Sequence, residues 1–292
     1  MRKLIIEARV NEFMMRDAGN PHVPYTPEEI AADALACREA GAAILHFHAR
    51  KADGAPEHDV ASYADTVRRV RQSSDILIHP TLGYATLDDT AEKRLSHILA
   101  MAESGNGPHF APMDMGSLNV DRYNAQSRRF ETQDLIYKNS TETLMYFGEN
   151  LKKARLKPYL VSWNIGFTRY VDAFMDMGVI EAPAFLCFCL TDNTWLGGHP
   201  GTLRGLQAHL DFLPPGKDVE WTVVNFGGNL YALAGAIIAA GGHISVGLGD
   251  YAYPELGAPT NAELVARVAA LARDLGREIA TPDEAKAMLG MA

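Results

Sequence analysis

Short apolar runs of strand length alternate along this chain with longer segments in which apolar residues recur at helical spacing. The alternation is typical of parallel strands joined by helices, because a parallel strand can only be reached by a crossover connection. The pattern predicts eight strands, at 4–10, 43–48, 76–79, 109–113, 159–163, 184–190, 221–226 and 243–248.

The helix starts carry chemical signals of their own. Thr26 precedes Pro27, Glu28 and Glu29, which combines an N-cap hydroxyl, a proline at the first helical position and an acidic first turn. Gly41 is placed to end this helix. Similar signals predict helices at 59–71, 87–103, 140–154, 168–177, 202–209, 230–240 and 261–275, with a last one beginning at 281–284.

Eight strand–helix units in 292 residues fit a (β/α)8 TIM barrel, an α/β fold. We predict a single domain over 1–292, because no Ser/Gly linker, low-complexity tract or short repeat divides the chain. The competing fold is a doubly wound open sheet. That fold usually carries a glycine-rich phosphate turn after an early strand, and the sequence has none.

Composition narrows the class of partner. The chain has 27 Lys and Arg against 36 Asp and Glu, for a net charge of −9, which argues against nucleic acid as a partner. The chain has three cysteines, Cys37, Cys187 and Cys189, which is an odd number, and all lie in apolar sequence. This pattern is typical of proteins from reducing compartments and not of a disulfide framework. No apolar stretch reaches membrane-spanning length or resembles a signal peptide. We therefore expect a cytoplasmic protein that binds neither nucleic acid nor membrane.

His46 and His48 close the second predicted strand and are the strongest local feature. Residues two apart on a strand point to the same face, so both imidazoles can reach one ion. In a TIM barrel the carboxyl ends of the strands face the active site, which favours a zinc pair here. The alternative is two hydrogen-bonded histidines lining a polar barrel mouth. His79, at the end of the third strand, is either a further ligand or a buried structural histidine.

The first predicted strand places three polar side chains on one face. Glu7, Arg9 and Asn11 alternate with Ala8 and Val10. Charged groups inside a barrel are costly unless they are paired or bind something, so we favour a functional role over a surface-facing edge strand. Glu7 offers a hard oxygen ligand, and Arg9 can hold a carboxylate or an oxyanion.

Further polar residues follow other strands. Thr81 lies in the loop after the third strand, Ser117 and Asn119 follow the fourth, and Asp250 stands at the end of the eighth. Each position is equally compatible with a turn or a helix cap. On the residues alone these four remain candidates.

Several motifs occur in order over nearly the whole chain: Pro24-Tyr25-Thr26-Pro27-Glu28-Glu29-Ile30-Ala31, Ala40-Gly41-Ala42, His46-x-His48-x-Arg50, Gly241-Gly242-His243, Asn261-x-Glu263-Leu264-Val265 and Gly276-Arg277-Glu278-Ile279-Ala280-Thr281. Together they resemble the β-keto acid cleavage enzymes, whose founding activity is 3-keto-5-aminohexanoate cleavage. The resemblance implies a TIM barrel, a zinc ion and a homotetramer.

The resemblance also implies a reaction, in which a β-keto acid and acetyl-CoA give acetoacetate and a new CoA ester. Zinc would polarise the keto group while a base removes a proton from carbon. The family's two zinc-binding histidines fall on His46 and His48. Its carboxylate contacts fall on Thr81, Ser117 and Asn119, and its amine-reading glutamate corresponds to Glu12.

The last strand departs from the family pattern of an Arg, a Glu four residues later and then an Asp. These positions are Ser245, Gly249 and Asp250, and a fifth-strand acid of the family falls on Val161. In a closed barrel the eighth strand lies beside the first. We therefore hypothesise that the first strand supplies the missing Glu and Arg.

The resulting prediction is a zinc ion on His46, His48 and Glu7, with His79 as the fallback for Glu7. Asp250 and Arg9 would handle proton transfer and enolate charge. Two alternatives stay open: another metal-dependent C–C lyase or aldolase on the same barrel, and a non-catalytic ligand-binding relative. Dependence on acetyl-CoA separates the first from the main prediction.

Overall fold

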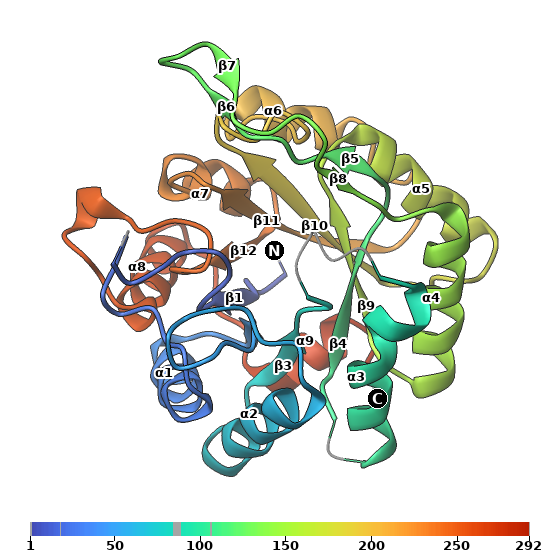
Figure 1. Ribbon diagram of the computed structural model, residues 1–292, viewed down its shortest axis with the longest axis horizontal. Coiled ribbons are helices and arrows are strands. Elements are labelled where there is room, and N and C mark those ends of the chain that lie inside the picture. The colour runs from blue at the N-terminus through green and yellow to red at the C-terminus, as the bar shows by residue number, and fades with distance from the viewer. Residues whose placement is uncertain (1, 18, 84–88, 106, 292) are drawn as a thin grey trace.

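Eight parallel strands form a nearly closed barrel (Figure 1). The computed structural model describes residues 2–17, 19–83, 89–105 and 107–291. The spatial order is β3-β2-β1-β12-β11-β10-β9-β4, and the His109 N–H donates to the Ile78 carbonyl at 2.8 Å between the β3 and β4 ends. The TIM-barrel prediction is therefore confirmed. The barrel strands are β1 (Ile6–Arg9), β2 (Ile44–Phe47), β3 (Leu77–Pro80), β4 (Phe110–Asp114), β9 (Lys157–Ser162), β10 (Ala184–Thr191), β11 (Val219–Phe226) and β12 (His243–Val246).

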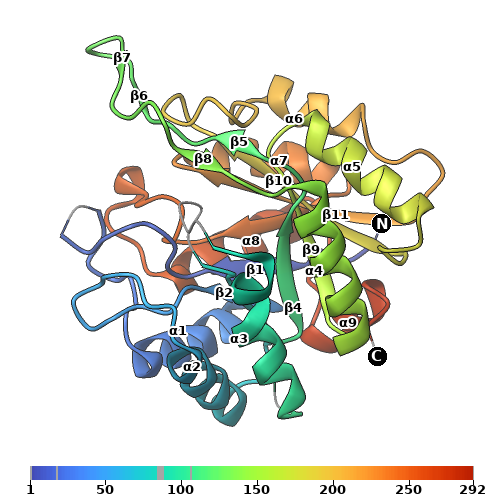
Figure 2. The ribbon, with the colours of Figure 1, turned by 45° about the vertical axis from the view of Figure 1, so that its right-hand side comes forward.

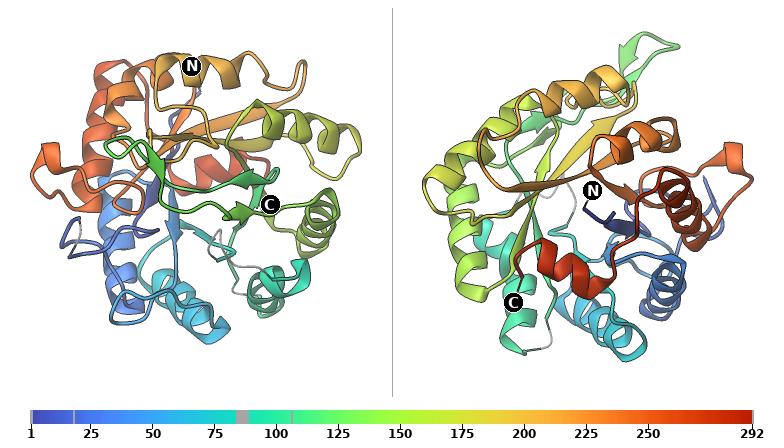
Figure 3. Two further views of the ribbon diagram at one scale, coloured as in Figure 1. Left: turned by 45° about the horizontal axis from the view of Figure 1, so that its top comes forward. Right: turned by 180° about the vertical axis from the view of Figure 1, so that it is seen from behind.

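Helices surround the barrel on its outside (Figures 1 and 3). Seen from behind, the last helix and both chain ends lie at the same end of the barrel (Figure 3). Within the described residues, no helix has both the length and the apolar character needed to cross a membrane. The helices are α1 (Pro27–Ala40), α2 (Val60–Ser73), α3 (Ala91–Glu103), α4 (Thr141–Ala154), α5 (Ile165–Asp176), α6 (Leu203–Leu210), α7 (Tyr231–Ala239), α8 (Asn261–Asp274) and α9 (Pro282–Met288), with a 3-10 turn at Pro254–Leu256.

The start of α1 forms as its sequence predicts. The Thr26 side chain accepts from the Glu29 N–H, and the Glu29 carboxylate accepts from the Thr26 N–H, which completes a capping box. Gly41 ends the helix with a left-handed φ of 119°. This helix start lies directly after the segment that follows β1, so its capping fixes the chain path above the barrel mouth.

The chain between β4 and β9 differs from the prediction. It contains two small antiparallel sheets, one of β5 (Leu118–Asn119) with β8 (Ile136–Tyr137) and one of β6 (Tyr123–Asn124) with β7 (Arg129–Phe130). The β6–β7 hairpin projects away from the barrel (Figure 2). Strands of two residues carry too few positions to show an alternating pattern, so hydrophobic periodicity could not predict them.

One helix start also differs from its predicted position. The helix expected from residue 87 begins at Ala91, because Thr90 provides the N-cap by accepting from the Lys93 N–H. Residue 87 lies outside the described residues.

The end of β12 packs unusually closely against the chain leaving β1. Glu7 pairs in register with Ser245, as expected for neighbouring first and last strands. A Cβ atom on Gly247 would lie 2.0 Å from the Arg9 carbonyl oxygen, and one on Gly249 would lie 2.7 Å from the Glu12 backbone nitrogen. A side chain is therefore excluded at both glycines, which follow the end of β12. The polar groups at this wall of the barrel mouth come largely from the chain after β1.

Candidate active site and metal centre

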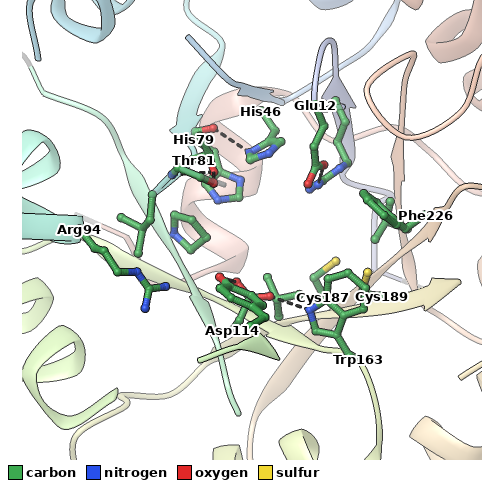
Figure 4. Close-up of a pocket in the computed structure, with 17 residues that line it drawn as sticks. Glu12, His46, His79, Thr81, Arg94, Asp114, Trp163, Cys187, Cys189 and Phe226 are labelled. Carbon is green, nitrogen blue, oxygen red and sulfur yellow. Dashed lines mark hydrogen bonds and ion pairs between the residues drawn. The ribbon is translucent and has the colours of Figure 1, made fainter. Parts of the chain in front are cut away.

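A cavity lies within the barrel at the carboxyl ends of the strands (Figure 4). Its wall includes a side chain from nearly every barrel strand: Arg9, His46, His79, Asp114, Val161, Cys187 and Val224. A second cavity shares Glu12, Trp163 and Phe226 with the first and is mostly apolar, with further walls from Phe13, Val120 and Trp195. The two cavities meet at Glu12.

His46 is held so that one ring nitrogen faces the interior without a partner. Its Nδ1 lies 3.0 Å from the His79 carbonyl oxygen, which can only accept, so Nδ1 carries the proton. Its Nε2 is buried and makes no hydrogen bond within the described part of the chain. A buried ring nitrogen with a free lone pair, fixed by a bond at the other nitrogen, is the arrangement found in metal-ligating histidines.

Glu7 lies deeper in the barrel, and both of its carboxylate oxygens accept hydrogen bonds. Oε1 is 2.7 Å from His79 Nδ1, and Oε2 accepts from the hydroxyls of Tyr159 and Ser245. Burial opposes ionisation, but the hydrogen bond and charge of His79, together with Arg9 and Ser245, lower the pKa of Glu7 below its ordinary value. Glu7 is therefore an ionised carboxylate with three donors around it.

Two overlapping groups of possible metal ligands result. Glu7, His46 and His79 form one group, and Glu12, His46 and His48 form the other; in each, the ligand atoms lie within 4.8 Å of one another. The ligands predicted from the sequence are thus divided, with Glu7 in the first group and His48 in the second. His46 belongs to both.

Burial also sets the protonation of the histidine pair. It lowers the pKa of His46 well below its ordinary value, with the charge of Arg9 adding to the effect. It lowers the pKa of His48 to about 3, although the nearby Glu12 carboxylate acts in the opposite direction. Both rings are therefore neutral at pH 7, which is the form that binds a metal.

Arg9 links two carboxylates across the β1–β12 wall. Its Nε donates to Asp250 at 2.9 Å, and its Nη2 forms an ion pair with Glu12 Oε2. Burial disfavours the charge, but Asp250, Glu12 and Glu7 together raise the pKa of Arg9 well above its ordinary value. Asp250 sits behind Arg9, outside the described lining of the cavity.

The structure separates the predicted substrate residues. Thr81 lines the cavity, where its hydroxyl donates to the Gly83 carbonyl at 3.0 Å. Ser117 and Asn119 are exposed and lie in the segment between β4 and β9. The Ser117 hydroxyl accepts from the Asn139 N–H at 2.8 Å, so it stands behind the wall of the cavity.

Sequence analysis missed a group on the opposite wall. Asp114, the last residue of β4, accepts from Trp163 Nε1 at 2.7 Å and from the Tyr137 hydroxyl at 2.8 Å. Its register partner on β9 is Val161. The available signal was an aspartate directly after the strand predicted at 109–113. Its two partners lie in β8 and just after β9, and no strand was predicted at β8.

In TIM barrels the reaction takes place at the end of the barrel where the strands terminate, and perturbed ionisable groups gather at functional sites. Here that end holds His46, the Arg9 ion pairs and Asp114 around one cavity, and His48 lines the cavity beside it. The fold and the site together define a TIM-barrel enzyme with a candidate metal centre.

The chain belongs to the β-keto acid cleavage enzyme family, whose model matches residues 3–291. It is 32% identical over 294 residues to a 3-keto-5-aminohexanoate cleavage enzyme of Fusobacterium nucleatum, covering 100% of this chain and 99% of that one. It is 29% identical over 308 residues to a 3,5-dioxohexanoate:acetyl-CoA acetone transferase of Paraburkholderia graminis, covering 99% and 96%. The family resemblance is confirmed, and the protein is an enzyme of the β-keto acid cleavage type.

A solved structure supports the fold. The binary complex of ObcA with oxaloacetate superposes with a TM-score of 0.71 at 15% identity, covering 93% of this chain and 68% of that chain. At this level of identity the similarity concerns the barrel architecture alone.

Proposed function

We propose that this enzyme transfers the acyl group of a β-keto acid to coenzyme A, with acetyl-CoA as the second substrate and a zinc ion at the histidine pair. The observation that carries the proposal is the His46 ring, held at Nδ1 and with a buried, unpartnered Nε2 facing the cavity within the described structure. Relatives named as acetyl-CoA transferases of dioxo and oxo acids support the choice of substrates.

The proposed reaction conserves every atom. C2 of the β-keto acid loses a proton, attacks the thioester carbon of acetyl-CoA and displaces the CoA thiolate. The thiolate then attacks the original keto carbon, and the bond from that carbon to C2 breaks. C2 regains a proton, which gives acetoacetate and the new acyl-CoA.

The residues present fit a zinc ion. Two neutral imidazoles and a nearby carboxylate are ligands that zinc prefers, and two such histidines leave positions open for substrate oxygens. When bound, the ion supplies a Lewis acid for the keto oxygen. His46 and His48 would hold it, and a carboxylate from β1 or from the chain directly after it would complete the protein ligands.

The chain's other residues would bind and orient the substrate. Thr81, Leu82 and Gly83, which follow β3, lie in the cavity wall, where the Thr81 hydroxyl and backbone N–H groups would hold the substrate carboxylate. Arg9 carries a permanent positive charge into the same cavity and would stabilise enolate charge, while Asp250 orients Arg9 through the bond to Nε. Ser117 and Asn119 would reach the carboxylate only if the excursion after β4 moved toward the cavity.

A panel of β-keto acids tests the proposal. Purified protein is incubated with each acid and acetyl-CoA, and mass spectrometry follows acetoacetate and the new CoA ester together. We expect both products in equal amounts and only when acetyl-CoA is present. Cleavage of a keto acid without acetyl-CoA would instead identify a C–C lyase or aldolase and overturn the proposal.

A further inference from the structure

We propose that Glu12, and not Glu7, is the carboxylate that completes the metal site with His46 and His48. The inference rests on the proposed function, because it assigns the third ligand of the metal proposed there. It is carried by how the hydrogen bonds of the two carboxylates are distributed.

Both oxygens of Glu7 already accept hydrogen bonds from buried donors. His79 donates to Oε1, and Tyr159 and Ser245 both donate to Oε2. A cation bound at Glu7 would compete with these donors for the carboxylate, and a buried donor that lost its acceptor would cost about 1–3 kcal/mol. Glu7 is better suited to hold His79 and the base of the barrel in place.

Glu12 contacts Arg9 and the Asp250 carboxyl group, and one of its oxygens lies near His48. Arg9 pairs with Oε2, whereas Oε1 lies 3.8 Å from His48 Nε2. Zinc–ligand bonds of about 2 Å that meet at tetrahedral angles separate two ligand atoms by about 3.3 Å, so a shift of about half an ångström would bring these two atoms to that separation. Arg9 then acts as the outer partner that orients a ligating carboxylate.

The backbone explains why the carboxylate is at position 12. The chain after β1 lies so close to Gly247 and Gly249 that a Cβ at either position would overlap Arg9 or Glu12 backbone atoms. A ligand from that part of β12 or its loop is therefore excluded. The Glu12 backbone lies against Gly249, and its side chain is among those that line both cavities.

Matched glutamine variants separate the two carboxylates. Wild-type protein, Glu12→Gln and Glu7→Gln are stripped of metal and titrated with zinc against a chromophoric chelator, and retained metal is measured by elemental mass spectrometry. We expect Glu12→Gln to bind zinc at least about 10-fold more weakly than wild type, since even outer partners of a ligand are worth 10- to 100-fold. Glu7→Gln should bind within about 3-fold of wild type.

Cobalt spectra provide a readout independent of affinity. Replacing zinc with Co²⁺ in wild type and Glu12→Gln should change the visible absorption bands, because one protein ligand is lost, while Glu7→Gln should leave them unchanged. Circular dichroism of the metal-free proteins checks folding. If Glu12→Gln does not fold, Glu12→Asp keeps the charge beside Arg9 and withdraws the oxygen by one methylene, and should still weaken zinc binding.

Unchanged zinc affinity in the Glu12 variants, or equal losses in Glu7→Gln, would overturn the assignment. Both results leave acyl transfer by the wild-type enzyme intact, so they are distinguishable from failure of the proposed function. Wild-type protein that takes up no zinc would overturn this inference together with the metal part of the proposal.

A second inference is carried by the opposite wall of the cavity. We infer that the Asp114 carboxylate removes and returns the C2 proton of the β-keto acid, again on the basis of the proposed function. Asp114 and Trp163 lie across the cavity from His46 and Glu12 (Figure 4). A substrate whose keto oxygen lay at the histidines would therefore have its carbon chain between the two walls.

The two donors of Asp114 hold its carboxylate in a fixed orientation. Trp163 donates to Oδ1 and Tyr137 to Oδ2, and both donors are neutral. Burial raises the pKa of Asp114, against the effect of these two hydrogen bonds and the charge of Arg94. The charge of Glu12 also raises the pKa of Asp114. A carboxylate made more basic and facing a cavity suits proton transfer from carbon.

Deuterium exchange tests this role without the complete reaction. Metal-loaded enzyme is incubated with a β-keto acid in deuterated water without acetyl-CoA, and the catalysed exchange at C2 above the buffer rate is followed by NMR. We expect Asp114→Asn to slow exchange at least about 100-fold while retaining its metal, which is the lower end of general-base effects. Asp250→Asn is measured beside it and should slow exchange less, since Asp250 acts on the enolate only through Arg9. Asp121→Asn is the matched control that should leave exchange unchanged, because Asp121 is buried but lines neither cavity.

Exchange at the wild-type rate in Asp114→Asn would overturn the assignment, even if the wild-type enzyme makes acyl-CoA. Loss of exchange in Asp250→Asn alone would assign the proton to Asp250 instead. Loss of metal from Asp114→Asn would identify a structural effect and would also count against the inference.

Discussion

Replacing Glu7 with glutamine should destabilise the barrel by about 3 kcal/mol. Glu7 accepts three buried hydrogen bonds, from His79, Tyr159 and Ser245. Hydrogen bonds to a charged group contribute about 1.5–3 kcal/mol each, and the relief of burying a charge offsets part of that sum. The glutamine keeps the volume, so no cavity contributes to the loss.

Urea denaturation of metal-free protein measures this difference, and its pH dependence identifies the cause. The folded pKa of Glu7 is lowered, so its stabilisation is present above the ordinary glutamate value of 4.5 and is lost as pH falls through the folded pKa. The gap between wild type and Glu7→Gln should therefore be full at pH 7 and shrink on acidification below about pH 4. Ser245→Ala, which removes one donor, should cost about 1 kcal/mol.

A difference below about 1 kcal/mol at pH 7 would refute this reasoning, because it would mean that the three donors find other acceptors or water. A gap that stays constant with pH would contradict the ionised state assigned to Glu7. Either result would also reopen Glu7 as a metal ligand.

Two further substitutions test the wall between β1 and β12. Gly247→Ala places a Cβ 2.0 Å from the Arg9 carbonyl oxygen. In urea denaturation it should lower the free energy of unfolding by about 2 kcal/mol or more, or prevent folding. An unchanged free energy of unfolding would show that this wall is not tightly packed. Arg9→Met removes the cation that Asp250 and Glu12 share and should reduce kcat/KM by at least about 100-fold when assayed at saturating zinc. An unchanged rate would exclude Arg9 from stabilising the enolate.

Much of the fold could be predicted because each barrel strand and helix is long enough to show a period. The Thr26 helix start carried its N-cap, proline and acidic turn in consecutive residues, and the structure reproduces all three. The two small sheets between β4 and β9 could not be predicted, because their strands are two residues long and pair through contacts that no local sequence pattern shows.

The site could be predicted only as far as strand alternation reaches. His46 and Arg9 were placed in the cavity because their strands end there, and both line it. The different roles of Glu7 and Glu12 could not be predicted from the sequence, because they depend on which hydrogen-bond donors surround each carboxylate in space. Asp114 was not predicted as a site residue for the same reason, since its hydrogen-bond partners come from two other segments of the chain.

The central claim is that the two substrates exchange acyl groups. The acyl group of the β-keto acid moves to CoA, and the acetyl group of acetyl-CoA becomes bonded to C2. The most direct measurement incubates the enzyme with an unlabelled β-keto acid and acetyl-CoA labelled with ¹³C at its carbonyl carbon, and follows the label by NMR. The account predicts that the label appears at C3 of acetoacetate, with none in the new acyl-CoA. Unlabelled acetoacetate, or label that leaves only as free acetate, would contradict it.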